Sequence, residues 1–282
     1  MIIEVNKLKQ KRTTKLLIHI TLIGFLAFWI FPVLFTILMA THTHSDAYAF
    51  PPILIPGDQL FVNIARAWSR INLGRLLFNS TVVSLSVAFG KIIFSLLAAF
   101  AFTHFEFRGR KLLFPLCMIT QMLPLPVRVF PLYRMMASAG WLNTYYALII
   151  PYLASTTGII LFRQFYLTIP DELPDAARID GASSLQYFFK ILIPLSKTNI
   201  AALFVIEFIY MWNQYLWPLV VTTQRDMMVS QIGLRMLYTT ERAAAEWNVV
   251  MGGTFLIMLP PLIILILLRK QFAHGVAMQS AK

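Results

Sequence analysis

Long apolar runs alternate with short polar stretches along the whole chain, and this pattern is the strongest signal in the sequence. A helix needs about 20 apolar residues to cross the hydrocarbon core of a membrane. The segments that reach this length are 16–40, 76–102, 112–130, 144–165, 198–221 and 249–268. The pattern therefore predicts an all-α integral membrane protein with six transmembrane helices.

The third of these segments contains residues that interrupt a helix. Pro124 and Pro126 lack a backbone N–H donor, and the charged Arg128 follows them within the same run. We expect the helix to break at this point and to continue as a short surface helix through residues 131–140.

The first apolar run follows a basic amino terminus, which is also how a signal peptide begins. This run is longer than the apolar region of a signal peptide, and no clear small-residue cleavage site follows it. We therefore expect it to be retained as a membrane anchor.

The basic residues predict the orientation in the membrane. With both termini in the cytoplasm, most Lys and Arg residues lie on that side, and every lysine does except Lys91, which is within a span. The positive-inside rule favours this arrangement. The predicted organisation is a cytoplasmic amino terminus (1–15), a membrane domain (16–268) with a cytoplasmic loop (166–197), and a cytoplasmic tail (269–282).

Composition supports the membrane assignment and excludes other classes. Hydrophobic residues make up 58% of the chain and charged residues 13%, whereas a soluble domain has about half and about a quarter. The net charge of +12 lies at the ends of apolar segments, so we expect lipid and not nucleic acid as its partner. The single Cys117 excludes an internal disulfide, and the pair His42 and His44 has no third ligand for a metal.

The 166–197 loop has the pattern of two short helices joined at a glycine. Pro174 and the acidic residues around it suit a helix amino terminus. Gly181 suits the end of that helix, and Ser183 with Gln186 has the spacing of a capping box that starts the next one. On periodicity alone, an interfacial helix pair that anchors the loop to the membrane explains this pattern as well.

The residues of this loop resemble the signature of bacterial ABC importer permeases, which is Glu-Ala-Ala followed by Gly and later by Ile-x-Leu-Pro. The matching residues are Asp175, Ala176, Ala177, Gly181, Ile191 and Pro194. Asp175 in place of Glu and Ile193 in place of Leu are conservative departures.

The resemblance extends to the carbohydrate branch of this family, whose familiar members are maltose-permease-like. Residues 79–80, 107–111 and 212–218 are similar to that branch. Stretches within 162–199 are most similar to permease subunits of sn-glycerol 3-phosphate importers. The implied solute is sn-glycerol 3-phosphate or a related glycerophosphodiester, and a sugar or oligosaccharide is the alternative.

The resemblance implies a type I ABC importer permease fold and a set of partners. These are a second permease subunit in a heterodimer, two ATP-binding subunits and a periplasmic solute-binding protein. ATP and Mg would be used by the ATP-binding subunits, with no cofactor on this chain. The chain has no Gly-x-x-x-x-Gly-Lys-Ser/Thr loop, so we expect a transporter subunit and not an enzyme. The residues implied in coupling to the ATPase are Asp175, Ala176, Ala177, Arg178, Gly181, Ile191 and Pro194.

Two charged residues within the apolar runs are candidates for the solute path. Lys91 and Glu207 are costly in a membrane, so they face protein or a cavity. In the functional interpretation they line the path, with Lys91 attracting a phosphate. In the structural alternatives they pair with each other or with polar neighbours, or the Lys91 side chain extends to the membrane interface. Asn79 is a further candidate. Amides and rings that suit a polyol ligand are carried by Trp212, Asn213, Gln214, Tyr215 and Trp217, and anchoring of Trp and Tyr at the interface explains this second group equally well.

Two segments outside the spans are implied in partner contacts. The 222–247 loop resembles a loop that reaches into the binding protein; we expect a helix near 226–237 and contacts through Arg225, Arg235 and Arg242. In the tail, Phe272 and Gly275 resemble a segment that enters the interface between the two ATPase subunits. A frayed end is the alternative for the tail.

Two other classes of membrane protein fit the sequence less well. An ion-coupled secondary transporter normally shows more spans and paired internal carboxylates, whereas Glu207 is the only acidic residue within a predicted span. A membrane enzyme requires a cluster of His, Asp or Cys at one membrane face, and the sequence shows none.

Overall fold

The computed structural model describes residues 2–239 and 245–280, and the described residues form helices and loops with no β-strand. Within these ranges, the side chains of residues 2–13, 120–122, 125 and 270–280 lie outside the description. The chain divides into two units. Unit 1 is Met1–Ile71 with Met236–Leu256, and unit 2 is Asn72–Arg235 with Ile257–Lys282. The predicted all-α class is confirmed for the described residues.

Four helical segments are long and apolar enough to cross a membrane. These are Thr14–Ala40, Leu73–His104, Tyr145–Tyr166 and Trp247–Arg269. A fifth candidate is the bent pair Ser184–Leu195 and Lys197–Trp212, whose parts meet at 72°. Each of the five overlaps one of the predicted apolar segments.

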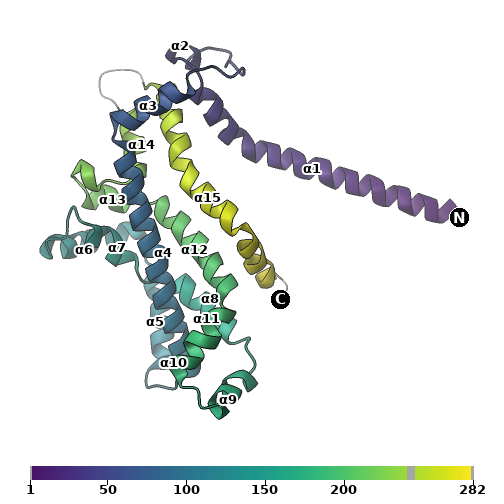
Figure 1. The fold of residues 1–282 in the computed structure, drawn as a ribbon, viewed down its shortest axis with the longest axis vertical. Coiled ribbons are helices and arrows are strands. Elements are labelled where there is room, and N and C mark those ends of the chain that lie inside the picture. Colours follow the sequence, from purple (N-terminus) through teal and green to yellow (C-terminus); the bar gives the residue numbers. More distant parts are fainter. Residues whose placement is uncertain (1, 240–244, 281–282) are drawn as a thin grey trace. The chain divides into compact units, whose positions relative to one another are not determined.

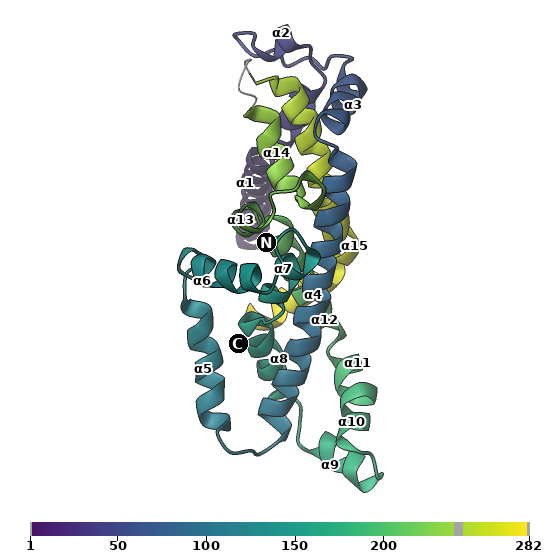
Figure 2. The same ribbon diagram turned by 90° about the vertical axis from the view of Figure 1, so that its left-hand side faces the viewer.

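The third predicted segment, 112–130, is divided between two shorter helices, α5 (Arg110–Met122) and α6 (Leu125–Ser138). The break falls at Leu123 and Pro124, where the prolines predict it. Figure 2 shows α6 turning away from the direction of α5. At about 1.5 Å per residue, α5 alone is shorter than the hydrocarbon core of a membrane.

Unit 1 contains α1 (Ile2–Ala40), α2 (His44–Ala47), α3 (Leu60–Arg70) and the first turns of α15 (Trp247–Ser280). The buried side chain of Asn63 ties these elements together. Its Nδ2 donates to the carbonyl oxygens of Ala40 and His42 at 2.9 and 2.8 Å, and its Oδ1 accepts from Asn248 Nδ2 at 2.9 Å. The His42 ring is buried and contacts the Ile55 carbonyl oxygen at 2.9 Å, so it serves packing in this unit.

Unit 2 is built around α4 (Leu73–His104), which packs against α8 (Thr156–Tyr166) and α12 (Lys197–Trp212) (Figure 1). Leu96, Phe162 and Leu203, one from each helix, belong to one buried core cluster. Gly158 allows the close approach, because a Cβ there would overlap the Ser95 side chain and lie 2.8 Å from Leu203.

The remaining elements of unit 2 are short. Between α6 and α8 lie α7 (Tyr145–Ile149) and the 3₁₀ turn η1 (Ile150–Tyr152). The next elements are α9 (Glu172–Ile179), α10 (Ser184–Tyr187), the π-helical turn η2 (Phe188–Leu192) and α11 (Ile193–Leu195). After α12 come α13 (Leu216–Val221), η3 (Arg225–Met227) and α14 (Ser230–Tyr238), whose last residues belong to unit 1.

The predicted single helix over 198–221 is wrong, because α12 ends at Trp212 and α13 begins at Leu216. Pro218 lies in the first turn of α13, where its missing N–H costs no hydrogen bond. The buried Trp217 indole donates to the Ala147 carbonyl oxygen at 2.8 Å, so packing against α7 sets the direction of α13.

The helix predicted near 226–237 begins four residues later, at Ser230 of α14. Asn79 Nδ2 donates to the carbonyl oxygens of Asp226 and Met228, both at 2.8 Å, and the Ser230 N–H donates to Ser80 Oγ at 2.8 Å. These contacts with α4 satisfy backbone groups that a continuous α-helix would otherwise use, and they separate η3 from α14 by the non-helical residues 228–229.

Candidate functional site

The 166–197 loop has the local structure that its sequence predicts. Gly181 adopts a left-handed φ of +74°, and the Ala182 N–H donates to the Ala177 carbonyl oxygen at 2.9 Å, which ends α9. Ser183 and Gln186 form the predicted capping box at the start of α10. Two short helices therefore meet at a glycine corner.

One face of α9 is attached to the protein and the other is exposed. Ala177 is buried in the core cluster that includes Phe100 and Leu192. Ala176 is exposed, and Ile179 is 86% exposed, although it is a large apolar residue. Apolar side chains exposed in this way mark an interaction surface when they gather on one element.

Asp175 and Arg178 lie on the same helix and interact with each other. Their Oδ1 and Nη1 atoms are 3.2 Å apart, and both side chains are largely exposed. An exposed pair of this kind is weak, so either partner can exchange it for a contact in another protein.

Aromatic contacts join the loop to the ends of the long helices. The rings of Phe188 and Phe100 have centroids 4.8 Å apart, and those of Tyr187 and His104 are 5.4 Å apart. His104 also contacts Tyr166 at the end of α8, at 6.1 Å. These contacts attach the loop to the end of α4, and His104 of α4 in turn contacts the end of α8.

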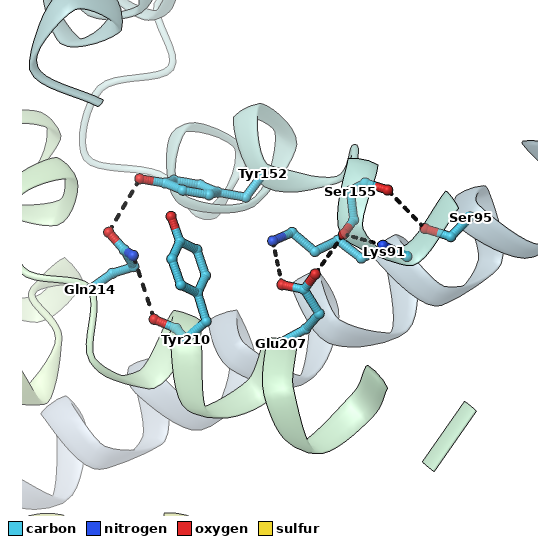
Figure 3. A network of polar contacts seen from close by, with 8 residues as sticks. Lys91, Ser95, Tyr152, Ser155, Glu207, Tyr210 and Gln214 are labelled. Carbon is cyan, nitrogen blue, oxygen red and sulfur yellow. Dashed lines mark hydrogen bonds and ion pairs between the residues drawn. The ribbon is translucent and has the colours of Figure 1, made fainter. Parts of the chain in front are cut away.

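A second cluster lies between α4, α8 and α12 and contains a buried ion pair (Figure 3). Lys91 Nζ lies 2.6 Å from Glu207 Oε2, and Ser155 Oγ donates to Glu207 Oε1 at 2.6 Å. Lys91 is 5% exposed and Glu207 is 4% exposed. The pairing offsets part of the cost of removing two charges from water.

Neutral groups complete this polar cluster. Ser155 is the N-cap of α8 and accepts the Gly158 N–H at 3.1 Å, while its carbonyl oxygen accepts from Ser95 Oγ at 3.3 Å. Lys91 Nζ lies 4.8 Å from the centroid of the Tyr210 ring, which is within the range of a cation–π contact.

The cluster continues from Tyr210 toward the surface. Tyr152 Oη donates to Gln214 Oε1 at 3.5 Å, and Gln214 Nε2 donates to the Tyr210 carbonyl oxygen at 3.5 Å. Tyr210 is 43% exposed, whereas the ion pair behind it is buried. The polar cluster therefore has a charged, buried end and a neutral, accessible end.

Comparison with known proteins identifies the chain. The family model for the binding-protein-dependent transport system inner membrane component matches residues 91–277, which include both clusters. The chain belongs to this family. It is therefore an inner membrane transport permease that works with a binding protein.

Curated relatives of the permease are similar over nearly its full length. The sn-glycerol-3-phosphate transport system permease protein UgpE of Yersinia pestis bv. Antiqua (strain Antiqua) is 40% identical, over 95% of this chain and 98% of that protein. The protein of the same name in Escherichia coli O1:K1 / APEC is 43% identical, over 91% and 94%.

A solved structure has the same fold. It is the crystal structure of a bacterial ABC transporter involved in the import of the acidic polysaccharide alginate. The TM-score is 0.82 with 21% sequence identity, over 93% of the permease and 97% of that chain. At this identity the likeness shows a shared fold and does not extend to the solute.

Of the residues suggested for the solute path, Lys91 and Glu207 are paired with each other, which was one of the alternatives. Trp212 is 2% exposed, and its indole donates to the Ile257 carbonyl oxygen at 3.1 Å, so it serves packing. Asn79 is buried and holds the 226–228 segment, as described above. Both side chains are therefore buried within this subunit.

The other suggested residues lie at the surface or outside the described part. Asn213 is exposed, and Tyr215 contacts Arg235 through its hydroxyl and its ring. Arg225 is exposed in η3. Arg242 lies outside the described residues, and only the backbone of the tail residues Phe272 and Gly275 is described.

Sequence reasoning missed Ser155, Tyr152 and Tyr210. The position of Ser155 before an apolar run is a recognisable helix start, so its role as an N-cap could have been found. The contacts of Tyr210 with Lys91 and of Tyr152 with Tyr210 depend on helix packing, and no sequence pattern indicates them.

Proposed function

We propose that the permease is one of the two membrane-spanning subunits of an ATP-binding-cassette importer for sn-glycerol 3-phosphate or a related glycerophosphodiester. It forms half of the translocation path. The full importer contains a different second permease, two ATP-binding subunits and an extracytoplasmic solute-binding protein. This chain binds no cofactor and has no ATPase site of its own, since ATP and Mg act on the partner subunits.

The observation that carries the solute assignment is the 40–43% identity to sn-glycerol-3-phosphate permeases over more than nine-tenths of the chain. A solute from the carbohydrate branch, such as a sugar or oligosaccharide, is the competing candidate. The test below distinguishes the two.

In this proposal, α9 and the glycine corner dock on one ATP-binding subunit. Support comes from the exposed surface of Ala176 and Ile179, from the aromatic contacts that join the loop to α4, and from the contact between His104 of α4 and Tyr166 of α8. Closure of the ATPase pair would then move the ends of these helices and change the side of the membrane on which the path opens.

The proposed topology has six spans, with both termini and the 166–197 loop in the cytoplasm. The distribution of lysines supports it, and α5 would form part of the third span. Single-cysteine variants, made in a chain without Cys117, test this topology. In intact cells, a membrane-impermeant thiol reagent should label only the cysteines that lie outside the cytoplasm. Labelling at residue 184 from outside would contradict the topology.

Uptake by the complete importer in proteoliposomes tests the function. With the loaded binding protein outside and ATP inside, radiolabelled sn-glycerol 3-phosphate should accumulate, and excess maltose should not compete. The control replaces ATP with a non-hydrolysable analogue and should abolish accumulation. Uptake of a neutral sugar with no uptake of sn-glycerol 3-phosphate would reject the proposed solute.

A further inference from the structure

A cavity of about 890 Å³ lies in unit 2 among the end of α4, the start of α5 and the last turns of α8. Its lining contains three cations, Arg110, Lys111 and Arg163, and one acid, Glu106. None of the ion pairs found in the described part of the chain includes any of the four. This cavity, the Arg163 pocket, therefore has an excess of positive charge in its lining.

Contacts within the permease hold the two guanidinium groups of the Arg163 pocket in place. Arg163 Cζ lies 4.5 Å from the centroid of the Phe114 ring, and that ring packs edge-on against Phe102 at 5.5 Å. Arg110 Nη1 donates to the Phe105 carbonyl oxygen at 3.3 Å. A guanidinium has five N–H donors, of which these contacts use at most one. The two arginines are therefore positioned before a ligand arrives, which lowers the entropy cost of binding.

The pocket lies where apolar surface meets positive charge. The predicted apolar run of α4 ends at Phe102, and that of α5 begins at Leu112, which lines the pocket together with Pro115. Farther along α5, Leu116 and Ile119 are 50% and 59% exposed. Basic pockets at the ends of membrane helices bind anionic lipid headgroups. The exposed apolar side chains beyond this pocket suit the acyl chains of such a lipid.

We propose that the Arg163 pocket binds the headgroup of an anionic phospholipid, with the acyl chains lying along α5. Arg110 and Arg163 contact the phosphate, because the planar guanidinium matches phosphate oxygens in geometry as well as in charge. Free inorganic phosphate offers the same oxygens but has no apolar part, so the exposed face of α5 favours the lipid. This inference goes beyond the proposed function, since it concerns a lipid site and not the solute.

Photocrosslinking in proteoliposomes tests the site. The complete importer is placed in phosphatidylcholine liposomes with a small fraction of photoactivatable phosphatidylglycerol, and mass spectrometry maps the crosslinked residues. Residues 110–116 should be labelled. The double variant Arg110→Gln with Arg163→Gln should lower this labelling about tenfold, because it removes two charge-assisted contacts. Replacing both arginines by Lys keeps the charge and should retain part of the labelling.

The matched control removes the same charge elsewhere. Arg134→Gln with Arg225→Gln changes two exposed arginines outside the pocket and should leave the labelling unchanged. Photoactivatable phosphatidylcholine at the same fraction should label residues 110–116 only weakly. Equal labelling by the two lipids in the unmodified importer would overturn the proposal, and this comparison is decisive even if the pocket variant fails to assemble.

Two further outcomes would assign the pocket to another occupant. Loss of the labelling on addition of millimolar inorganic phosphate at constant ionic strength would identify a free-anion site and overturn the lipid assignment. No labelling of residues 110–116 by either lipid would show that a partner subunit covers the pocket. The assay requires no transport, so a failure of sn-glycerol 3-phosphate uptake would reject the proposed solute and leave the lipid site standing.

Discussion

The ion pair of Lys91 and Glu207 joins two helices inside the membrane domain, and its two charges depend on each other. Both side chains are buried, and Ser155 is the only other hydrogen-bond donor to the carboxylate among the described residues. Replacing a buried pair by apolar residues is often nearly neutral, whereas removing one partner leaves an unpaired charge.

Glu207→Leu should therefore lower the stability of the permease by about 3–5 kcal/mol. The double variant Lys91→Met with Glu207→Leu should recover most of this loss. Thermal unfolding of the purified importer measures both effects, and Lys190→Met, which changes an exposed lysine, is the matched control. A double variant as unstable as Glu207→Leu alone would contradict the pairing.

At the scale of the short helices, substitution of the glycines at helix ends gives a direct test of the proposed docking surface. Gly181 and Gly140 both have a left-handed φ, of +74° and +70°, and a Cβ at either position would meet no atom within 4 Å. A bulky residue therefore causes similar backbone strain at both positions, at a cost of about 1–3 kcal/mol. The two glycines differ in position, since only Gly181 follows α9.

Gly181→Trp should leave membrane insertion intact but abolish solute transport and weaken binding of the ATP-binding subunits, because the added ring occupies the docking surface. Gly140→Trp is the control for strain alone and should retain both properties. Co-purification and uptake assays measure the outcome. Full transport by Gly181→Trp would show that this corner does not dock the ATPase.

The assembled importer should use the 222–247 loop for contact with the binding protein. Gln224 and Arg225 are exposed in the described part of this loop. In a chain without Cys117, cysteines at these two positions should form crosslinks to cysteines in the binding protein during turnover. A cysteine at exposed Ser184 is the control and should form none, because it lies in the loop assigned to the opposite side. Intact transport without any crosslink from the 222–247 loop would contradict the assignment.

The tail should contribute to communication between the subunits. The backbone of α15 continues as a helix to Ser280. Deleting residues 276–282 should lower solute-stimulated ATPase activity while the complex still assembles. An importer truncated in this way that hydrolyses ATP and transports normally would show that the tail is a frayed end.

The local predictions were confirmed in part, since four long apolar helices and one bent pair overlap five of the six predicted spans. The spans follow from the length of apolar runs, and the glycine corner and capping box of the 166–197 loop follow from residues that interact with partners a few positions away. The break before α6 also follows from local chemistry, since proline lacks a donor. The membrane class, the family and the local form of the loop could therefore be predicted from the sequence.

The features that the sequence left open depend on contacts between distant segments. Lys91 and Glu207 are 116 positions apart, and the sequence allowed them to pair or to line a path until the packing of α4 against α12 brought them together. The end of α12 at Trp212 and the late start of α14 depend on contacts with α7 and α4. The sequence by itself determined what was local, namely the apolar lengths and the caps. Only the tertiary structure decided which polar groups meet, because helix packing sets these distances and one-dimensional spacing does not.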